Sequence, residues 1–233
     1  HNNKYYLTFP WVQDKTETLA YAMADSPMGP FTFTGIIMDE SPSGCWTNHH
    51  SITEYNGQWY LFYHHNDYSP NFDKNRSARI DSLFFNTDGT IKKVKPTLRG
   101  VGITDARSKI QIDRYSTISP YGVTIDYLEP SNTFEGWQTL FNRAGTWVTY
   151  NKVDFGTTPV KRLKARVRSE KGGAITLRTP GEKGMTIAEL PIKPTGKWTE
   201  ISTNVSNAPT SMQDLIITQT GENPVAVDWI SFE

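Results

Sequence analysis

Short β-rich runs alternate with turn residues along the whole chain, and this rhythm constrains the fold more than any other feature. Asn56-Gly57 and Asp88-Gly89 each separate two such runs, as two-residue hairpin turns with positive φ require. The periodicity of amphipathic helices is nearly absent. The sequence therefore predicts an all-β protein built from antiparallel strands.

The rhythm changes near residues 98–110 (LRGVGITDARSKI), where glycine and charged residues gather. Before this point, antiparallel units recur every few tens of residues, each with its own aromatic side chains, which is typical of β-propeller blades. After it, around nine short strands follow in roughly 125 residues, the strand density of a β-sandwich. We therefore predict two domains, residues 1–105 and 108–233.

Composition limits the partners that the chain is expected to bind. The 24 Lys and Arg balance the 24 Asp and Glu, so no electrostatic field suggests nucleic acid or an acidic membrane surface. No apolar stretch approaches the roughly 20 residues that a membrane-spanning helix needs. Aromatic residues make up 12% of the chain, which suits a β-sheet core and also suits sugar binding by ring stacking. We expect neither nucleic acid nor membrane as a partner.

The first residues, HNNKYYLTF, are typical of the turn and second strand of a hairpin. Asn2-Asn3 is turn chemistry, and the run from Lys4 to Phe9 is rich in β-forming residues. The first strand of such a hairpin would precede His1. We therefore expect this chain to be the C-terminal part of a longer protein.

Two His-His pairs flank the hairpin around Asn56-Gly57. Counting outward from this turn places His49 opposite His64 on one face, while His50 points to the other face. The hairpin therefore has no four-histidine cluster. Zinc needs three or four ligands, and neither an HExxH motif nor a pair of cysteines accompanies these histidines. They are either hydrogen-bonded structural residues at strand ends or residues that face water or substrate.

Four stretches of the first half match one known family in chain order. They are HNNKYYLTF, ADSPMGPFTFTGIIM, NHHSITEYNGQWYLFYHH and NRSARIDSLFFNTDGTIKKVKPT. These stretches resemble glycoside hydrolase family 43, a family of five-bladed propeller arabinofuranosidases and xylosidases. The resemblance implies that residues 1–105 are the later blades of a partial five-bladed β-propeller, whose N-terminal blades are missing and would be its partners.

The second half is similar to family 6 carbohydrate-binding modules. The similarity lies in IQIDRY, GTWVTYNKVDFG, ARVRS, IAELPIKPTGKWTEI and TGENPVAVDWISF. It implies a β-sandwich of the jelly-roll type. Together the two resemblances imply a fragment of a secreted or periplasmic bacterial enzyme. That enzyme would remove arabinofuranosyl or xylosyl groups from arabinan, arabinoxylan or xylan of plant cell walls with inversion, without an organic cofactor.

The resemblance also implies roles for residues of the first half. His49 matches a histidine of the propeller channel that helps to hold a calcium ion or its waters. Because calcium prefers oxygen ligands, a lone histidine implies a mostly hydrated ion. Arg76 matches an arginine that reaches the sugar pocket, a role that suits its planar, permanently charged fork. Trp46 would form a wall of this pocket, and His64 would also face the substrate.

These roles have structural alternatives. Arg76 could instead form a surface ion pair with Asp73 or Asp81, and Trp46 could pack in the core. The inverting mechanism needs a general acid and a general base roughly 6.5–9.5 Å apart. In this family the acid and the base come from blades that would precede His1. We assign no catalytic role to the loop acids Glu40, Asp67 and Asp73.

In the second half, the resemblance implies a calcium site and a sugar cleft. The calcium site would consist of Gln111, Asp113 and Asp228, with Gln111 in place of the usual glutamate and hence less negative charge. The cleft would stack a sugar between Phe141 and Trp198, with alanine in place of a cleft asparagine at position 226. Two rival interpretations stay open: a non-catalytic carbohydrate-binding protein, and a purely structural sandwich.

Overall fold

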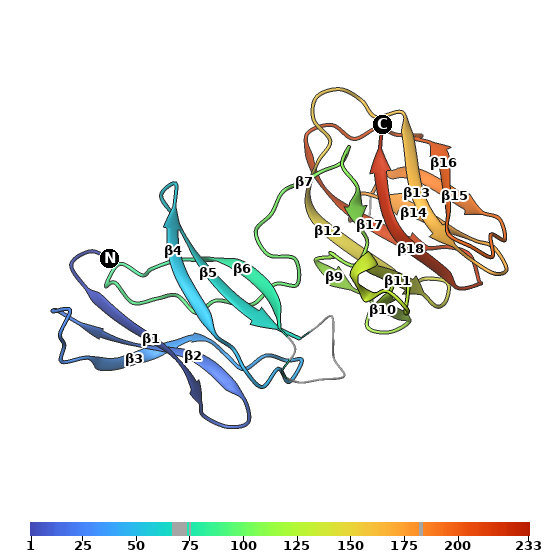
Figure 1. Ribbon diagram of the computed structural model, residues 1–233. Coiled ribbons are helices and arrows are strands. Elements are labelled where there is room, and N and C mark those ends of the chain that lie inside the picture. Colours follow the sequence, from blue (N-terminus) through green and yellow to red (C-terminus); the bar gives the residue numbers. More distant parts are fainter. Residues whose placement is uncertain (67–73, 75, 182–183) are drawn as a thin grey trace. The chain divides into compact units, whose positions relative to one another are not determined.

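The chain folds into strands joined by turns (Figure 1). The computed structural model describes residues 1–66, 74, 76–181 and 184–233. In these residues the only helical element is a short 3-10 turn, η1 (Thr133–Glu135), so the predicted all-β class is confirmed. No helix of the described residues is long and apolar enough to span a membrane. The chain forms two compact units, His1–Val101 and Gly102–Glu233.

The first unit contains two antiparallel sheets of three strands each, with the orders β1-β2-β3 and β4-β5-β6 (Figure 1). Apolar side chains of the two sheets and of the following segment form one core, as expected for two successive propeller blades. The core consists of Leu19, Tyr21, Ile37, Met38, Leu61, Tyr63, Leu83, Ile91 and Val94. The strands are β1 (Tyr5–Val12), β2 (Glu17–Ala24), β3 (Thr32–Met38), β4 (His50–Tyr55), β5 (Gln58–His65) and β6 (Ser77–Leu83).

The hairpin between β4 and β5 has the predicted turn. Asn56 and Gly57 have φ values of 51° and 78°, and Tyr55 pairs with Gln58. Positive φ at both central residues matches the right-handed twist of the flanking strands, which is why this dipeptide forms so tight a turn.

The turn at Asp88-Gly89 differs from the prediction, because only Gly89 has a positive φ, at 84°. Phe85 forms a bridge with Ile91, which leaves a longer turn between them. A carboxylate oxygen of Asp88 accepts hydrogen bonds from the backbone N–H of Thr90 at 2.9 Å and from its hydroxyl at 2.7 Å. This side-chain-to-backbone bonding stabilises a different turn from a two-residue hairpin loop.

The second unit is a β-sandwich of two sheets (Figure 1). One sheet has the order β10-β11-β18-β13-β16 with β8 beside β18, and the other has the order β15-β14-β17-β12-β7 with β9 beside β12. The strands are β7 (Thr104–Asp105), β8 (Ile110–Gln111), β9 (Thr117–Ile118), β10 (Val123–Tyr127), β11 (Trp137–Phe141), β12 (Trp147–Asp154), β13 (Arg162–Arg168), β14 (Gly173–Arg178), β15 (Thr186–Ile192), β16 (Thr199–Asn204), β17 (Met212–Gln219) and β18 (Val225–Phe232).

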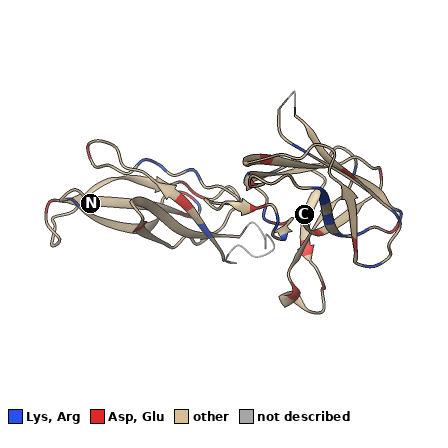
Figure 2. Cartoon of the chain, turned by 90° about the horizontal axis from the view of Figure 1, so that it is seen from above, with Lys and Arg blue, Asp and Glu red and all other residues tan. Residues whose placement is uncertain are grey.

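Strand alternation gives this unit its core. On β13, Leu163, Ala165 and Val167 are fully buried, whereas the basic residues between them lie on the outer face. Basic and acidic residues are interspersed along both units (Figure 2), in keeping with the balanced charge.

The second unit begins slightly earlier than the sequence suggests. β7 pairs in parallel with β12, with Thr104 opposite Val153 and Asp105 opposite Asp154. Thr104 and Asp105 therefore belong to the sandwich. The predicted boundary, between residues 105 and 108, followed a cluster of glycine and charged residues and did not account for this short strand.

Candidate functional site

His49 and His64 lie side by side at one end of the sheet β4-β5-β6. The last pair of the ladder joins His50 to Tyr63, so His49 comes next opposite His64. The His49 backbone N–H donates to His64 Nε2 at 3.1 Å, and the two ring centroids are 5.7 Å apart. The predicted His49–His64 pair is therefore confirmed.

His50 takes the opposite face, as the alternation predicts. It is partly buried, and neither ring nitrogen has a hydrogen-bond partner among the described residues. Burial lowers the pKa of His50 below its ordinary value, and the neighbouring His49 lowers it further. Burial therefore favours the neutral form of the His50 ring.

The surroundings of His64 favour the neutral form of its ring. Because its Nε2 accepts the His49 N–H, the neutral ring carries its proton on Nδ1, a tautomer assigned from the hydrogen bond. Burial lowers the pKa of His64, and the positive charge of Arg76 lowers it further. Arg76 is exposed, yet it lies within electrostatic reach of His64. The structure thus brings His49, His64 and Arg76 together.

A carboxylate that the sequence analysis missed completes this group. Glu17, the first residue of β2, accepts the Asn48 backbone N–H at 2.6 Å through Oε2, and the same oxygen lies 3.9 Å from His49 Nε2. We call Glu17, His49, His64 and Arg76 the blade-end cluster. A signal was present in the sequence, since an acidic residue opens the otherwise apolar strand ETLAYAMA. Only the packing of the two sheets shows what it contacts.

Trp46 is hydrogen-bonded to Glu17 through its backbone. Its carbonyl oxygen accepts the Glu17 N–H at 3.1 Å, and its side chain remains 36% exposed. The alternative of core packing is therefore wrong. The ring is accessible at the surface, although it does not line the cavity described next.

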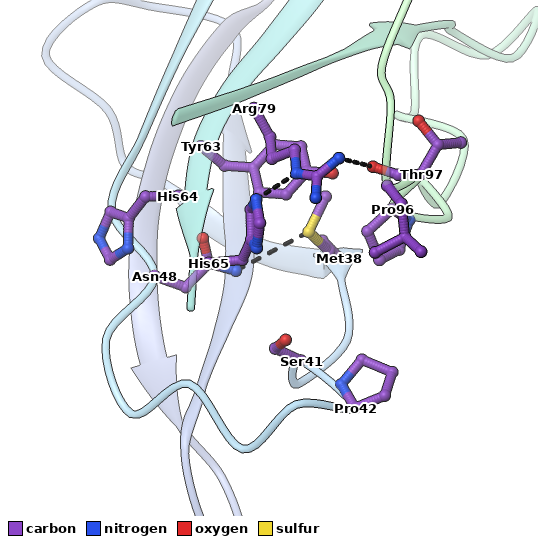
Figure 3. Close-up of a pocket in the computed structure, with 11 residues that line it drawn as sticks. Met38, Ser41, Pro42, Asn48, Tyr63, His64, His65, Arg79, Pro96 and Thr97 are labelled. Carbon is purple, nitrogen blue, oxygen red and sulfur yellow. Dashed lines mark hydrogen bonds between the residues drawn. The ribbon is translucent and has the colours of Figure 1, made fainter. Parts of the chain in front are cut away.

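A cavity of about 210 Å³ lies beside the blade-end cluster (Figure 3). Met38, Pro42 and Leu98 supply apolar walls, while Asn48, His65 and Arg79 bring buried polar groups. Arg79 donates through Nε to His65 Nε2 and through a terminal nitrogen to the Thr97 carbonyl oxygen, the latter at 3.3 Å. His64 also belongs to the cavity lining, so the predicted substrate-facing residue lies at its edge.

Asp81 fixes the segment that closes this cavity. Its carboxylate accepts hydrogen bonds from the Tyr63 hydroxyl at 2.6 Å and from the Thr97 hydroxyl and N–H at 2.6 and 3.1 Å. Burial, and then the bond to Asp81, raises the pKa of Tyr63. In the described residues Asp81 shows no ion pair with Arg76, so the Asp81 half of the structural alternative is not supported, and the Asp73 half stays untested. Asp67 and Asp73 lie outside the described residues.

In the sandwich, Phe141 does not form a cleft wall. It is fully buried on β11, between Val123 of β10 and Val225 of β18. Because strand residues alternate, the inward direction of Phe141 sends Leu140 outward instead. Leu140, Arg168 and Ala226 line a surface hollow of about 550 Å³. The prediction for Phe141 is wrong because it took the nearest aromatic match to the family's cleft without the direction in which this side chain points.

Trp198 lies just before β16 and is half-buried. The guanidinium groups of Arg166 and Arg168 stand 5.4 and 5.1 Å from its ring centroid. These are cation–π distances. The ring therefore already contacts two cationic side chains of β13.

The predicted calcium residues of the sandwich do not fit a calcium ion. Asp113 and Asp228 are buried, and Gln111 is exposed. Asp228 is ion-paired with Arg166 at 2.6 Å, and Asp113 with Arg114 at 3.0 Å. No group of three or more His, Cys, Asp or Glu able to hold a metal occurs in the part of the chain that the structure describes. His49 likewise belongs to no such group among the described residues.

Comparison with known proteins adds a family to this geometry. Residues 119–233 match the sequence model of the carbohydrate binding module (family 6), so the second unit contains a module of this family. The chain is 28% identical over 245 residues to an arabinoxylan arabinofuranohydrolase of Paenibacillus polymyxa, covering 95% of this chain and 38% of that protein. It is 44% identical over 97 residues to a β-xylosidase of Xylanibacter ruminicola, covering 41% of this chain and 28% of that protein.

A solved structure supports the same assignment at the level of the fold. The glycoside hydrolase family 43 arabinoxylan arabinofuranohydrolase of Bacillus subtilis matches with a TM-score of 0.64 and 24% identity, covering 100% of this chain and 52% of that one. The chain thus spans between about a quarter and half of the proteins that it matches. These similarities fit a C-terminal portion of a family 43 glycoside hydrolase followed by a family 6 carbohydrate-binding module.

Proposed function

We propose that this chain is the C-terminal part of a glycoside hydrolase that removes arabinofuranosyl or xylosyl residues from plant cell-wall polysaccharides with inversion. The blade-end cluster carries the proposal. Glu17 Oε2 lies 3.9 Å from His49 Nε2, the His49 backbone N–H donates to His64, and His64 lines the cavity, while the charge of Arg76 acts on His64. The relatives named arabinofuranohydrolase and xylosidase support the substrate class.

In this proposal the cluster binds and orients sugar and does not cleave it. Arg76 supplies a fixed positive charge and hydrogen-bond donors, and neutral His64 supplies no competing charge. The general acid and base would come from preceding blades of the parent protein. Its substrates would be arabinan, arabinoxylan or xylan, in a secreted or periplasmic enzyme. His49 would help to hold a hydrated calcium ion in the complete propeller.

Exposed apolar surface on the first sheet supports the role of missing blades. Leu7 and Phe33 both pair with Ala22 of β2, so their side chains lie on the same face of this sheet. Leu7 is 50% exposed and Phe33 is 52% exposed. The exposed Trp11 contacts Phe33 edge to face, with ring centroids 5.2 Å apart. A neighbouring blade would bury this face.

The second candidate is a carbohydrate-binding protein without catalysis. The family 6 module favours it, because such a role needs no acid or base. The contacts of Trp198 with Arg166 and Arg168 weaken the ring as a stacking platform. Catalysis by the parent therefore remains the better-supported proposal.

The test uses a longer form of the protein in which the proposed preceding blades stand before His1. Proton NMR should show the extended protein releasing arabinose or xylose from arabinoxylan, with the inverted anomer appearing first. Arg76→Ala should lower kcat/KM at least about 100-fold, the scale of a lost charged contact to the reacting sugar. Release of the retained anomer, or no release from arabinan, arabinoxylan or xylan, would contradict the proposed function.

A further inference from the structure

Basic side chains surround Asp228 at the place where the family resemblance implies a calcium ion. The Arg166 guanidinium contacts the buried Asp228 carboxylate at 2.6 Å. The Lys109 ammonium lies 4.4 Å from the ring centroid of the next residue, Trp229. Burial raises the pKa of Asp228, and the charges of Arg166 and Lys109 act in the opposite direction. Arg114 pairs with the neighbouring buried carboxylate, Asp113. Three cationic side chains therefore accompany two carboxylates.

Arg166 stands where the opening strand of the module joins the sheet. On one side of β18, Trp229 pairs with Gln111 of β8, and on the other side it pairs with Arg166 of β13. The register shifts between Arg166 and Val167, so Asp228 is the extra residue of a bulge. Its carbonyl oxygen accepts the Ile112 N–H at 3.0 Å, while its carboxylate contacts Arg166. Asp228 thus connects the opening segment to β13.

We propose that the Arg166 guanidinium replaces calcium as the cation of this site, so that the module folds and remains folded without calcium. This inference concerns the module alone and goes beyond the proposed hydrolase activity. It also separates the module from any calcium that the propeller half binds through His49.

The supply of oxygen ligands supports the replacement. Calcium takes about six to eight oxygen ligands. The Tyr150 hydroxyl lies 2.5 Å from the carbonyl oxygen of Ile112 and 3.1 Å from that of Gln111 and shares its one proton between them, and the carbonyl oxygen of Asp228 accepts a backbone N–H. Gln111 itself is exposed. A calcium ion would therefore have to share these carbonyl oxygens with O–H and N–H donors and to draw both carboxylates away from their arginine partners.

The charge balance leads to the same conclusion. With both carboxylates ionised, the three basic side chains already give the site a surplus of one positive charge. A divalent cation would raise this surplus and would compete with Arg166 for the same carboxylate oxygen. The two carboxylates are buried, whereas Arg114 and Lys109 are exposed and more strongly screened, so the main opposition to calcium comes from the direct Arg166–Asp228 contact.

The direct test records the Trp229 indole N–H signal of the full chain by ¹H–¹⁵N NMR. The protein is first stripped with EDTA and then titrated with calcium chloride to about 5 mM. We expect the Trp229 signal to stay in place, because the ion does not enter the site beside it. A saturable shift of this signal would overturn the proposal, whatever other signals do. Signals of the first unit report separately on any calcium bound there.

A variant tests the role assigned to the guanidinium. Arg166→Gln removes the charge next to Asp228, and Arg162→Gln on the same side of β13 is the matched control, because Arg162 is exposed. In EDTA, Arg166→Gln should lower the thermal midpoint of the sandwich by several degrees more than Arg162→Gln does. Calcium should recover part of the loss only in Arg166→Gln. Equal midpoints for the two variants in EDTA would show that the guanidinium does not hold the site, and would overturn the proposal.

Discussion

His64 shows how one side chain takes its chemistry from its neighbours. Burial and the charge of Arg76 keep its pKa below the ordinary value of 6.5, and the His49 N–H occupies its Nε2. A neutral ring with a defined tautomer suits a surface that binds an uncharged sugar. The same features make His64 a probe of the blade-end cluster in solution.

The first prediction concerns the pKa of His64. Arg76→Ala should raise it toward 6.5, because a repelling positive charge is removed, whereas Arg76→Lys should leave it low. The signal of the His64 ring carbon-bound proton, followed by NMR against pH, measures this. An unchanged pKa in Arg76→Ala would show that Arg76 does not face His64.

The lowered pKa of His64 also gives stability a pH dependence. The unfolded chain takes up the proton at about the ordinary value of 6.5, before the folded chain does. This contribution to stability is therefore fully present above that pH and decreases as the pH falls through it. Burial shifts His50 in the same direction, so the two contributions add.

The second prediction concerns Glu17. Glu17→Ala leaves the Asn48 N–H without its acceptor, so it should lower the free energy of unfolding by about 1–3 kcal/mol. Glu17→Gln keeps an oxygen for this bond and should lower it by less. Urea unfolding of both variants measures the difference. Equal losses would mean that the hydrogen bond is not what Glu17 contributes.

At the residue scale, sequence reasoning succeeded where strand parity alone decides the geometry. The pairing of His49 with His64 needs only a count from the turn. Glu17 was beyond this approach, and for Phe141 parity had to be combined with knowledge of which face of the strand meets the core. The contacts of Glu17 depend on the packing of one sheet against another, and the direction of Phe141 depends on which face of β11 meets the core.

At the scale of elements, one glycine fixes the segment that follows β6. Gly100 has a φ of +81°, its N–H donates to the Thr97 hydroxyl, and an added Cβ would lie 2.5 Å from the carbonyl oxygen of Ile80. Both the backbone conformation and the close approach therefore require glycine. The Asp81–Thr97 bonds that close the cavity depend on this path of the chain.

The third prediction is that Gly100→Ala lowers the free energy of unfolding of the first unit by roughly 1–3 kcal/mol or more. Gly102→Ala is the matched control, because Gly102 has nothing within 4 Å of its added Cβ. Thermal unfolding compares the two variants. If Gly100→Ala is as stable as Gly102→Ala, the segment has another available path.

The fourth prediction follows from the corrected position of Phe141. Phe141→Ala should lower the free energy of unfolding of the sandwich by about 3–5 kcal/mol, because it leaves a cavity in the core. Phe134→Ala should change it by no more than about 0.5 kcal/mol, since Phe134 is 97% exposed. A stable Phe141→Ala variant with altered sugar binding would restore the cleft assignment.

The elements themselves were largely readable from the sequence. Asn56-Gly57 predicted its hairpin because that dipeptide favours a single turn type. Asp88-Gly89 did not form the predicted two-residue turn, because the Asp88 carboxylate accepts hydrogen bonds from Thr90 in a longer turn. The short strand β7 had no signal of its own, since its position depends on pairing with β12.

At the scale of the whole molecule, the two units have different tasks in our account. The first unit supplies the blade-end cluster and an exposed apolar face for further blades. The second unit contains a family 6 module, in which the Arg166–Asp228 ion pair links β13 to β18. The sequence indicated both architectures through strand rhythm. It could not indicate that basic side chains occupy the surroundings of Asp228, since those residues come from separate strands.

The central claim is that this chain carries substrate-facing residues but neither the general acid nor the general base. The most direct measurement is release of 4-nitrophenol from 4-nitrophenyl arabinofuranoside and 4-nitrophenyl xyloside, with the 233-residue chain beside the N-terminally extended protein. We predict release by the extended protein and none above the uncatalysed rate by the chain alone. Turnover by the 233-residue chain itself would contradict the account.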